Sequence, residues 1–386
     1  MREKLAEISE MRDVIARDIW DSTNSAHAQS IDLNSNNNHA KQIATLLLTA
    51  SLSTAVNSIK GLTQSEVFEC LIDPHHKGSD FKNAFDEFIK SAWYLHQSQE
   101  GRTYFSHQEN LTKKLQGYAD KAPPNKVDQL IRHRLEEMYK PVTKEAYEVV
   151  LPLPEMDEAE AELKSKRALL IISPDGKVPP SIVTNFYNNL PNKNNILVLT
   201  GEKSSMASVE TAARHVYAST KADSEISDSH PQRKELDEKK TQYQQDFQST
   251  VISVFDKILF PGYNQNNNED ILRNKPLDSS YPSNEAYNGE RQIMKTLTSD
   301  PIKLYTSIEE NFDTLRARVE ATIFGKQEEL RKLDIIDKMK QNTQMPWLPP
   351  RTIDEVIRLA QQKGLWEDLG NGYITIKPVL LPFEWN

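Results

Sequence analysis

The chain has one cysteine, Cys70, so no disulfide can form within it. Scarcity of thiol pairs is typical of cytoplasmic proteins, which is the compartment we expect. Cys70 falls on an expected amphipathic helix and is predicted to fill the core. No apolar run approaches the roughly 20 residues of a membrane span, and the charged first 20 residues do not have the pattern of a signal peptide. We therefore expect no membrane partner.

A surplus of positive charge is also lacking. The sequence has 47 basic against 56 acidic residues, a net charge of −9. That balance argues against a protein that coats nucleic acid by bulk electrostatics, although a local basic patch is compatible with it. With 386 residues, of which 37% are hydrophobic, the chain is long enough for two to four modest cores.

No string matches the phosphate-binding loop G-x-x-x-x-G-K-[ST]. The nearest is Gly201-Glu202-Lys203-Ser204, where a glutamate separates glycine from lysine. A carboxylate would repel phosphate at that point, and no glycine stands five positions before Gly201. We predict that this chain holds no ATP and no other cofactor.

Residues 41–125 have the pattern of a winged-helix domain. An apolar helix is expected at 41–51, and a second helix begins after Thr63, whose capping box is completed by Glu66. A third begins at Asp80. Its apolar residues recur at three- and four-residue steps: Phe81, Ala84, Phe85, Phe88, Ile89, Ala92 and Trp93. Two β-prone runs around the turn at Gln99–Gly101 complete the expected hairpin, the wing, with Trp93 buried beneath it.

From residue 147 the pattern changes to short apolar runs at 147–153, 168–173 and 196–200, alternating with helical segments. Strand, helix, strand, helix predicts parallel strands. We therefore expect an α+β, mostly helical fold. Its expected parts are an N-terminal helix and polar connector (1–40), the winged-helix domain (41–125), a small α/β parallel-sheet unit (126–222), a region of long helices (223–345) and a C-terminal winged-helix-like tail (346–386).

A series of short motifs occurs in this order: Ser51-Leu52-Ser53, Gly61, Ser65-Glu66, Trp93-Tyr94-Leu95, Tyr104-Phe105 and Asn110-Leu111. This order resembles the region that follows the ATPase core in large AAA+-type ATPases of phage-defence islands, the PglY-like ATPases of BREX systems among them. The likeness continues through Leu151-Pro152-Leu153-Pro154 and the strands at 169–172 and 197–199.

The resemblance implies a non-catalytic, C-terminal part of a phage-defence ATPase. ATP and Mg²⁺ would then belong to an ATPase core outside this chain, and Met1, which opens inside an expected helix without a cap, would be an internal start. The implied partners are that core or other defence-system subunits, with double-stranded DNA as a further candidate.

The candidate DNA contacts are five cations. Lys82 and Lys90 lie on the third helix, and Arg102, Lys113 and Lys114 lie on the wing and the segment after it. Winged helices commonly contact DNA through these two elements. Asp86 and Glu87 on the same helix would repel phosphates, so packing against a protein partner is the competing interpretation.

Two further hypotheses belong to other classes. A stand-alone enzyme would use the α/β unit near Asp175, which follows the second strand, although Pro174-Asp175-Gly176 is also a typical turn. A purely structural scaffold is the other alternative. His75 and His76 lack a third ligand at usable spacing, so we predict no metal site.

Overall fold

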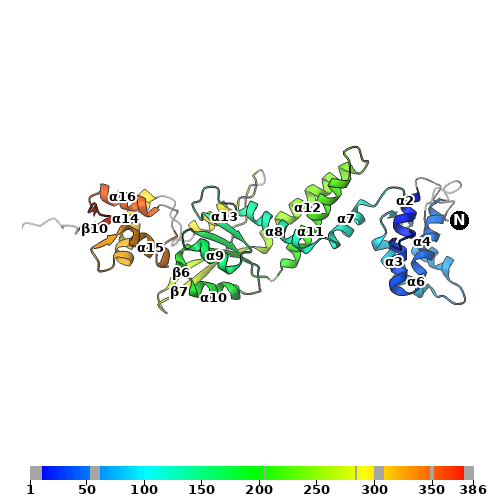
Figure 1. Ribbon diagram of the computed structural model, residues 1–386, viewed down its shortest axis with the longest axis horizontal. Coiled ribbons are helices and arrows are strands. Elements are labelled where there is room, and N and C mark those ends of the chain that lie inside the picture. The colour runs from blue at the N-terminus through cyan, green and yellow to red at the C-terminus, as the bar shows by residue number, and fades with distance from the viewer. Residues whose placement is uncertain are drawn as a thin grey trace, which may run out of the picture. The chain divides into compact units, whose positions relative to one another are not determined.

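The computed structural model describes residues 11–52, 61–98, 100–203, 205–282, 285–299, 308–347 and 352–377. The fold is α+β and mostly helical, as predicted. The chain divides into two compact units. Figure 1 labels helices and strands of both units. Unit 1 comprises Met1–Pro123 and Arg214–Gln244, and unit 2 comprises Pro124–Ala213 and Gln245–Asn386.

Unit 1 contains a helical core. Its elements are α2 (Arg12–Val14), the π-helix η2 (Ile15–Ile19), α3 (His27–Ser35), α4 (His39–Leu52), α5 (Gln64–Leu71) and α6 (Gly78–Ser91). Up to residue 10, the expected N-terminal helix falls on residues that the structure does not describe. On α6, Phe81, Phe85 and Phe88 recur at helical spacing and pack in one core with Ile43 and Leu47 of α4. The predicted registers of these helices are therefore confirmed.

The polar connector predicted up to residue 40 is wrong, because α3 occupies part of it. Asp32, in the last turns of α3, accepts the backbone N–H groups of Ala40 at 2.8 Å and Lys41 at 3.1 Å, at the start of α4. Ile31 supplies the buried side of α3. The polar residues of this segment thus cap and join helices, which is a common role for aspartate.

A hairpin follows α6, as predicted. β1 (Leu95–Gln97) pairs antiparallel with β2 (Thr103–Phe105). Gly101 takes a positive φ of 76° in the turn between them, a conformation that favours glycine. On the other side of β2, Leu62 exchanges two backbone hydrogen bonds with Thr103, at 3.0 and 2.7 Å. The order along the chain is therefore helix, extended residue, two helices and a hairpin.

A second cluster completes unit 1. α7 (Leu111–Asp120) packs against α11 (Met206–Glu225) and α12 (Arg233–Val254) through the residues that those two helices contribute to this unit. The contacting side chains are small or aliphatic: Leu111, Leu115 and Ala119 on α7 with Ala218, Ala222 and Leu236. Lys113 and Lys114 therefore lie on a helix, and the sequence pattern that assigned them to the hairpin region missed α7.

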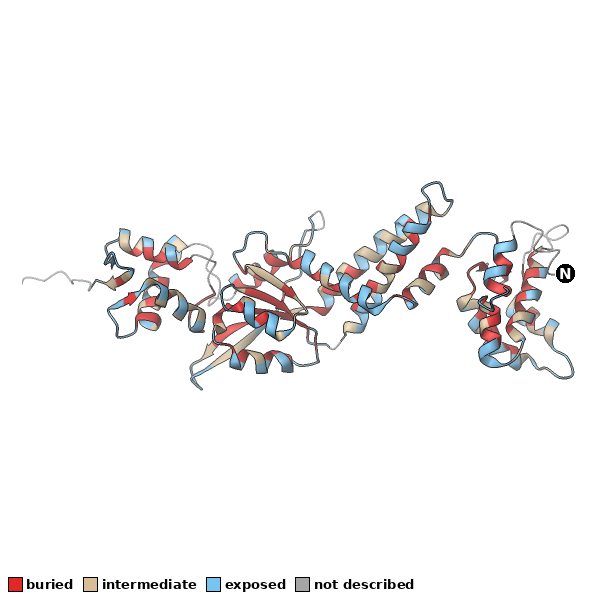
Figure 2. Ribbon diagram, in the orientation of Figure 1, coloured by how far each residue is buried: buried red, intermediate tan, exposed pale blue. Residues whose placement is uncertain are grey.

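Unit 2 is built on a mixed sheet with the strand order β3-β4-β5-β6-β7. The predicted parallel strands are β3 (Val149–Pro152), β4 (Ala168–Ile171) and β5 (Ile196–Thr200). β4 and β5 are buried throughout (Figure 2). The accompanying helices are α8 (Pro124–Tyr139), α9 (Met156–Leu163) and α10 (Ser181–Asn189), with the 3₁₀ helix η3 (Lys193–Asn195) directly before β5.

The prediction that residues 223–345 are helical is wrong over β6 (Lys257–Asn264) and β7 (Glu269–Pro276), which add an antiparallel hairpin to the sheet. It is also wrong over the short strand at Glu329–Arg331. In the sequence, the apolar stripe of α12 continues at helical spacing through Phe255 to Ile258, which lies on β6, so the helical pattern extends into the strand. Ile258, Leu259 and Phe260 are consecutive and all buried, as expected for a strand covered on both faces.

The C-terminal part of unit 2 has its own core. After α13 (Gly289–Thr298), the elements are α14 (Ile308–Val319), the π-helix η4 (Glu320–Phe324), β8 (Glu329–Arg331), α15 (Lys332–Gln341), α16 (Thr352–Gln362), β9 (Trp366–Asp368) and β10 (Tyr373–Ile376). The three strands form a sheet of order β8-β10-β9. Because β8 pairs with β10, the predicted boundary at 345/346 falls inside this core, which we call the C-terminal module (308–377). Residues 378–386 lie outside the described residues.

Candidate partner or nucleic-acid interface

The outer face of α6 has mixed charge. Lys82 and Lys90 are exposed, and Asp86, midway between them at four-residue steps, is partly exposed. Glu87 is exposed as well. Side chains four residues apart lie on one side of a helix. This face of α6 therefore carries its two cations beside two carboxylates.

Arg102 is held by α5. Its Nη2 lies 3.0 Å from Glu66 Oε2, and its Nε donates to the Gly61 carbonyl at 3.3 Å. Glu66 also accepts the Thr63 backbone N–H at 2.8 Å, which completes the predicted capping box. That hydrogen bond, followed by the Arg102 charge, holds the pKa of Glu66 below its usual value. Arg102 thus ties the hairpin to the start of α5.

Lys113 and Lys114 are turned into the protein. Lys113 Nζ donates to the Leu95 carbonyl at 3.0 Å, and burial lowers the pKa of this lysine to about 8. Lys114 is only 8% exposed, and its Nζ lies 2.7 Å from Glu109 and 3.6 Å from Glu225. Three of the five candidate cations, Arg102 among them, therefore already have partners within unit 1.

The junction between α6 and β1 is anchored by an aspartate that the sequence pattern did not reveal. Asp18, fully buried on η2, accepts the backbone N–H of Trp93 at 2.9 Å and of Tyr94 at 2.6 Å. Burial raises the pKa of Asp18 to about 6, against the opposing effect of these two hydrogen bonds. The sequence did contain one indication of a buried aspartate, because Asp18 lies between the apolar residues Ile15 and Ile19.

Trp93 is buried, as predicted, with 8% of its surface exposed. The described ring and cation contacts of its indole come from elements other than the hairpin. The guanidinium of Arg17 lies 3.8 Å from the centroid of the indole, and the ring of Tyr118 on α7 packs edge-on with a centroid-to-centroid distance of 5.7 Å. The indole therefore joins η2 to α7, two elements that are distant from it in the sequence.

Asp175 behaves as a turn and capping residue. It accepts the backbone N–H of Lys177 at 3.0 Å and of Ser181, the first residue of α10, at 2.9 Å. The Ser181 hydrogen bond is the main cause of its lowered pKa. In the Gly201–Ser204 string, Glu202 lies 3.3 Å from Lys257 Nζ, so that carboxylate is used in an ion pair.

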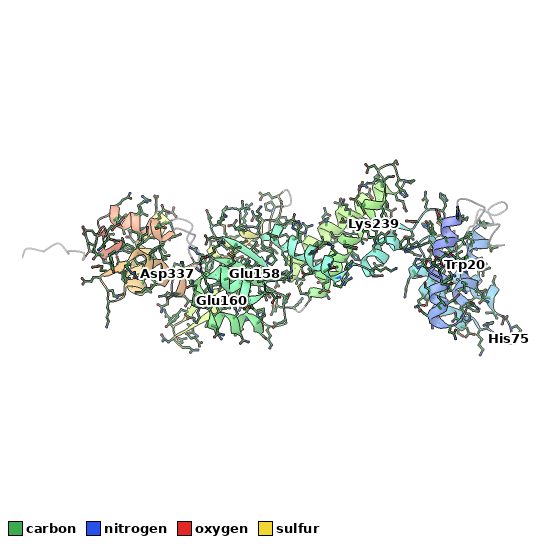
Figure 3. All side chains as sticks on the ribbon, in the orientation of Figure 1. Trp20, His75, Glu158, Glu160, Lys239 and Asp337 are labelled. Atoms are coloured by element: carbon green, nitrogen blue, oxygen red, sulfur yellow. The ribbon has the colours of Figure 1, made fainter. Side chains whose placement is uncertain are left out.

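Cys70 is exposed, which corrects the prediction that it fills the core. His75 and His76 form a turn in which Asp73 accepts both backbone N–H groups, at 2.7 and 2.8 Å. Figure 3 shows His75 at the outer edge of this turn. In the described part of the chain, no three His, Cys, Asp or Glu side chains are grouped to hold a metal ion.

No protein-family model, curated protein or solved structure matches this chain. None of the described helices combines the length and the apolar character that crossing a membrane requires.

Proposed function

We propose that this chain is a protein-docking part of a phage-defence ATPase of the PglY-like group, and that it acts in the cytoplasm on an ATPase core outside this sequence. The choice of family rests on the sequence resemblance. ATP and Mg²⁺, which that family uses, are assigned to the ATPase core and not to this chain. The observation that favours a protein partner is the charge of the α6 face, where Lys82 and Lys90 lie beside Asp86 and Glu87.

Both small modules are proposed to be winged helices. In unit 1 the order is α4, Leu62, α5, α6 and the hairpin β1–β2, with β2 between Leu62 and β1. In the C-terminal module the order is α14, β8, α15, α16 and β9–β10, with β10 between the other two strands. The same arrangement thus occurs twice. Helix-turn-helix folds of this kind use their last helix as the contact surface, which assigns that role to α6 and α16.

Electrostatics favours a protein over DNA as the partner. Binding to duplex DNA depends on cations that are free to replace counterions. Arg102 and Lys114 are already paired with carboxylates, and the half-buried Lys113 donates to a backbone carbonyl. Lys82 and Lys90 are exposed, so weak binding to DNA through these two lysines is the second candidate function.

The test is binding between the purified chain and the purified ATPase core of a PglY-like system, measured by calorimetry. Reversing Lys82 and Lys90 to glutamate is expected to weaken binding at least tenfold. The matched control reverses Lys126 and Lys234, which are exposed elsewhere, and should bind like wild type. Equal binding by both double variants would remove α6 as the docking face, and no complex with the core would contradict the proposed function.

A further inference from the structure

The dipeptide asparagine-glycine occurs twice in the chain, at Asn371-Gly372 and at Asn288-Gly289. Asparagine is a chemically labile residue, and a following glycine favours loss of its side-chain amide because no side chain obstructs the glycine nitrogen. Asn371 and Gly372 are both exposed in the turn between β9 and β10. Asn288 is the N-cap of α13, and Gly289 is buried as the first residue of that helix. The fold therefore gives the two identical dipeptides different surroundings.

The exposed pair is arranged for deamidation, whose first step joins the Gly372 backbone nitrogen to Asn371 Cγ. Asn371 Oδ1 accepts the backbone N–H of Tyr373 at 3.2 Å, which folds the side chain back over the Gly372 peptide. The same hydrogen bond withdraws electrons from Cγ and makes that carbon a better electrophile. In the part of the chain that the structure describes, the Gly372 N–H has no hydrogen-bond acceptor, and no atom lies within 4 Å of the position that a Cβ would take.

The second pair is protected by packing. Atoms of the Tyr139 ring and the Met138 carbonyl occupy the space where a Cβ of Gly289 would stand. Asn288 Oδ1 accepts the backbone N–H of Arg291 at 2.9 Å, as expected for a helix N-cap. Deamidation needs hydroxide to remove the glycine N–H proton and water to open the cyclic intermediate. Burial of Gly289 excludes both, so the same dipeptide should be stable there.

We propose that Asn371 is a site of deamidation that proceeds without an enzyme, and that Asn288 is protected from this reaction in the folded chain. Hydroxide removes the proton of the Gly372 N–H, the nitrogen bonds to Asn371 Cγ, and the side-chain amide leaves as ammonia. Water then opens the resulting succinimide at either carbonyl, which gives aspartate or isoaspartate at position 371. Overall, water is consumed and ammonia is released, with no oxidant or reductant.

The isoaspartate product alters the hairpin, because its backbone passes through the former side chain and is longer by a methylene group. The turn leads into β10, the middle strand of the order β8-β10-β9. Leu369 donates its backbone N–H to the Tyr373 carbonyl at 3.0 Å, and Lys332 donates to the Gly372 carbonyl at 2.9 Å. A longer backbone at 371 displaces both acceptors and should loosen β9 and β10. This site is independent of the docking function proposed for α6, so either proposal can fail alone.

The test is incubation of the full, folded chain at mildly alkaline pH, followed by peptide mapping with mass spectrometry. Asn371 should be converted at least tenfold faster than Asn288, with both aspartate and isoaspartate among the products. In urea neither dipeptide keeps its folded surroundings, so the two should be converted at similar rates. Equal rates in the folded chain, or a rate at Asn371 that is tenfold slower in the folded chain than in urea, would overturn the proposal.

Two variants test the assignment to Asn371. Asn371→Gln keeps an amide, but its longer side chain must close a larger ring, so conversion at this position should slow at least tenfold. Its matched control, Asn188→Gln, changes an exposed residue of α10 and should leave the rate at Asn371 unchanged. Unfolding curves check that both variants are folded. Conversion of Asn371→Gln at the wild-type rate, or slower conversion of Asn371 in the control, would contradict the assignment.

Hydrogen exchange tests the structural consequence. The isoaspartate form, separated from the unmodified chain by chromatography, should exchange the amide hydrogens of β9 and β10 at least tenfold faster than the unmodified chain. The hairpin β1–β2 of unit 1 is the internal control and should exchange at the same rate in both forms. Unchanged exchange in β9 and β10 would contradict the proposed loosening of the hairpin.

Discussion

The carboxylate of Asp18 accepts the backbone N–H of Tyr94 at 2.6 Å, across 76 positions of sequence. The same carboxylate accepts the neighbouring N–H of Trp93. These two N–H groups follow the end of α6, so one buried side chain on η2 fixes where the hairpin leaves the helix. A charge-assisted hydrogen bond of this kind is stronger than one between neutral groups, which offsets part of the cost of burying the carboxylate.

The pH dependence of stability should expose two opposing groups at this anchor. Because the pKa of Asp18 is raised to about 6, the folded chain keeps a proton that the unfolded chain releases near pH 4. The contribution of Asp18 to stability therefore falls between pH 4 and 6, by at most about 3 kcal/mol. Burial lowers the pKa of His27 to about 4, so the contribution of His27 rises over nearly the same interval.

The measurement is urea unfolding from pH 4 to 6.5. In Asp18→Asn the opposing contribution of Asp18 is gone, so the free energy of unfolding should rise more steeply with pH than in wild type. In His27→Gln the contribution of His27 is gone, so the free energy of unfolding should fall as the pH rises. The charges of Arg17, Lys113 and Lys121 also act on His27 and stay unchanged in both variants. Identical pH slopes in wild type and both variants would contradict the assignment of these pKa shifts.

Local patterns in the sequence predicted what depends on local spacing. The capping box of Thr63 and Glu66 and the buried face of α6 follow from residues within one or two turns, and both are confirmed. The partners of Trp93 could not be predicted in this way. Arg17 and Tyr118 reach it from elements that lie far from it in the sequence, and no periodicity encodes such a contact.

The candidate cations show the same limit. A lysine or arginine in the sequence gives no indication of whether a carboxylate will lie beside it after folding. Lys114 meets Glu225, which is contributed by α11 more than 100 residues later. The β6–β7 hairpin was missed for a different reason. The apolar stripe of α12 runs into β6 without a break, so only the tertiary fold decides between helix and strand there.

Removal of the Trp93 side chain should destabilise unit 1 strongly. Trp93→Ala takes a large, 8% exposed ring away from Arg17 and Tyr118, and the expected cost is about 3–5 kcal/mol. Urea unfolding followed by circular dichroism gives the value. Lys82→Ala, on the exposed face of α6, is the control and should change stability by less than about 0.5 kcal/mol. A Trp93→Ala variant as stable as that control would contradict the packing.

The purified chain should neither bind nor hydrolyse ATP. Its sequence has no phosphate-binding loop, and Glu202 intervenes between Gly201 and Lys203. Release of phosphate from ATP is the assay, with Lys203→Ala and Asp175→Ala as variants. Turnover that survives Lys203→Ala but disappears in Asp175→Ala would favour the enzyme hypothesis and would place its site near the start of α10.

If the chain binds duplex DNA, the contacts should come from α6. Lys82 and Lys90 are exposed, so replacing both with alanine should reduce the slope of log K against log salt by about 1.8, which is about 0.9 for each phosphate that the chain no longer neutralises. The reduction in affinity should be equal for all DNA sequences, because phosphates carry no sequence information.

The triple variant with alanine at Arg102, Lys113 and Lys114 distinguishes this arrangement from binding through the hairpin and α7. These three cations already have partners within unit 1, so their removal should leave the salt slope unchanged. Salt titrations of duplex binding by wild type, the double variant and the triple variant provide the comparison, with unfolding curves to check that each chain is folded. A slope that falls by about 2.7 only in the triple variant would mean that these ion pairs open on DNA. In the absence of binding even at low salt, a protein partner would remain as the proposed ligand of α6.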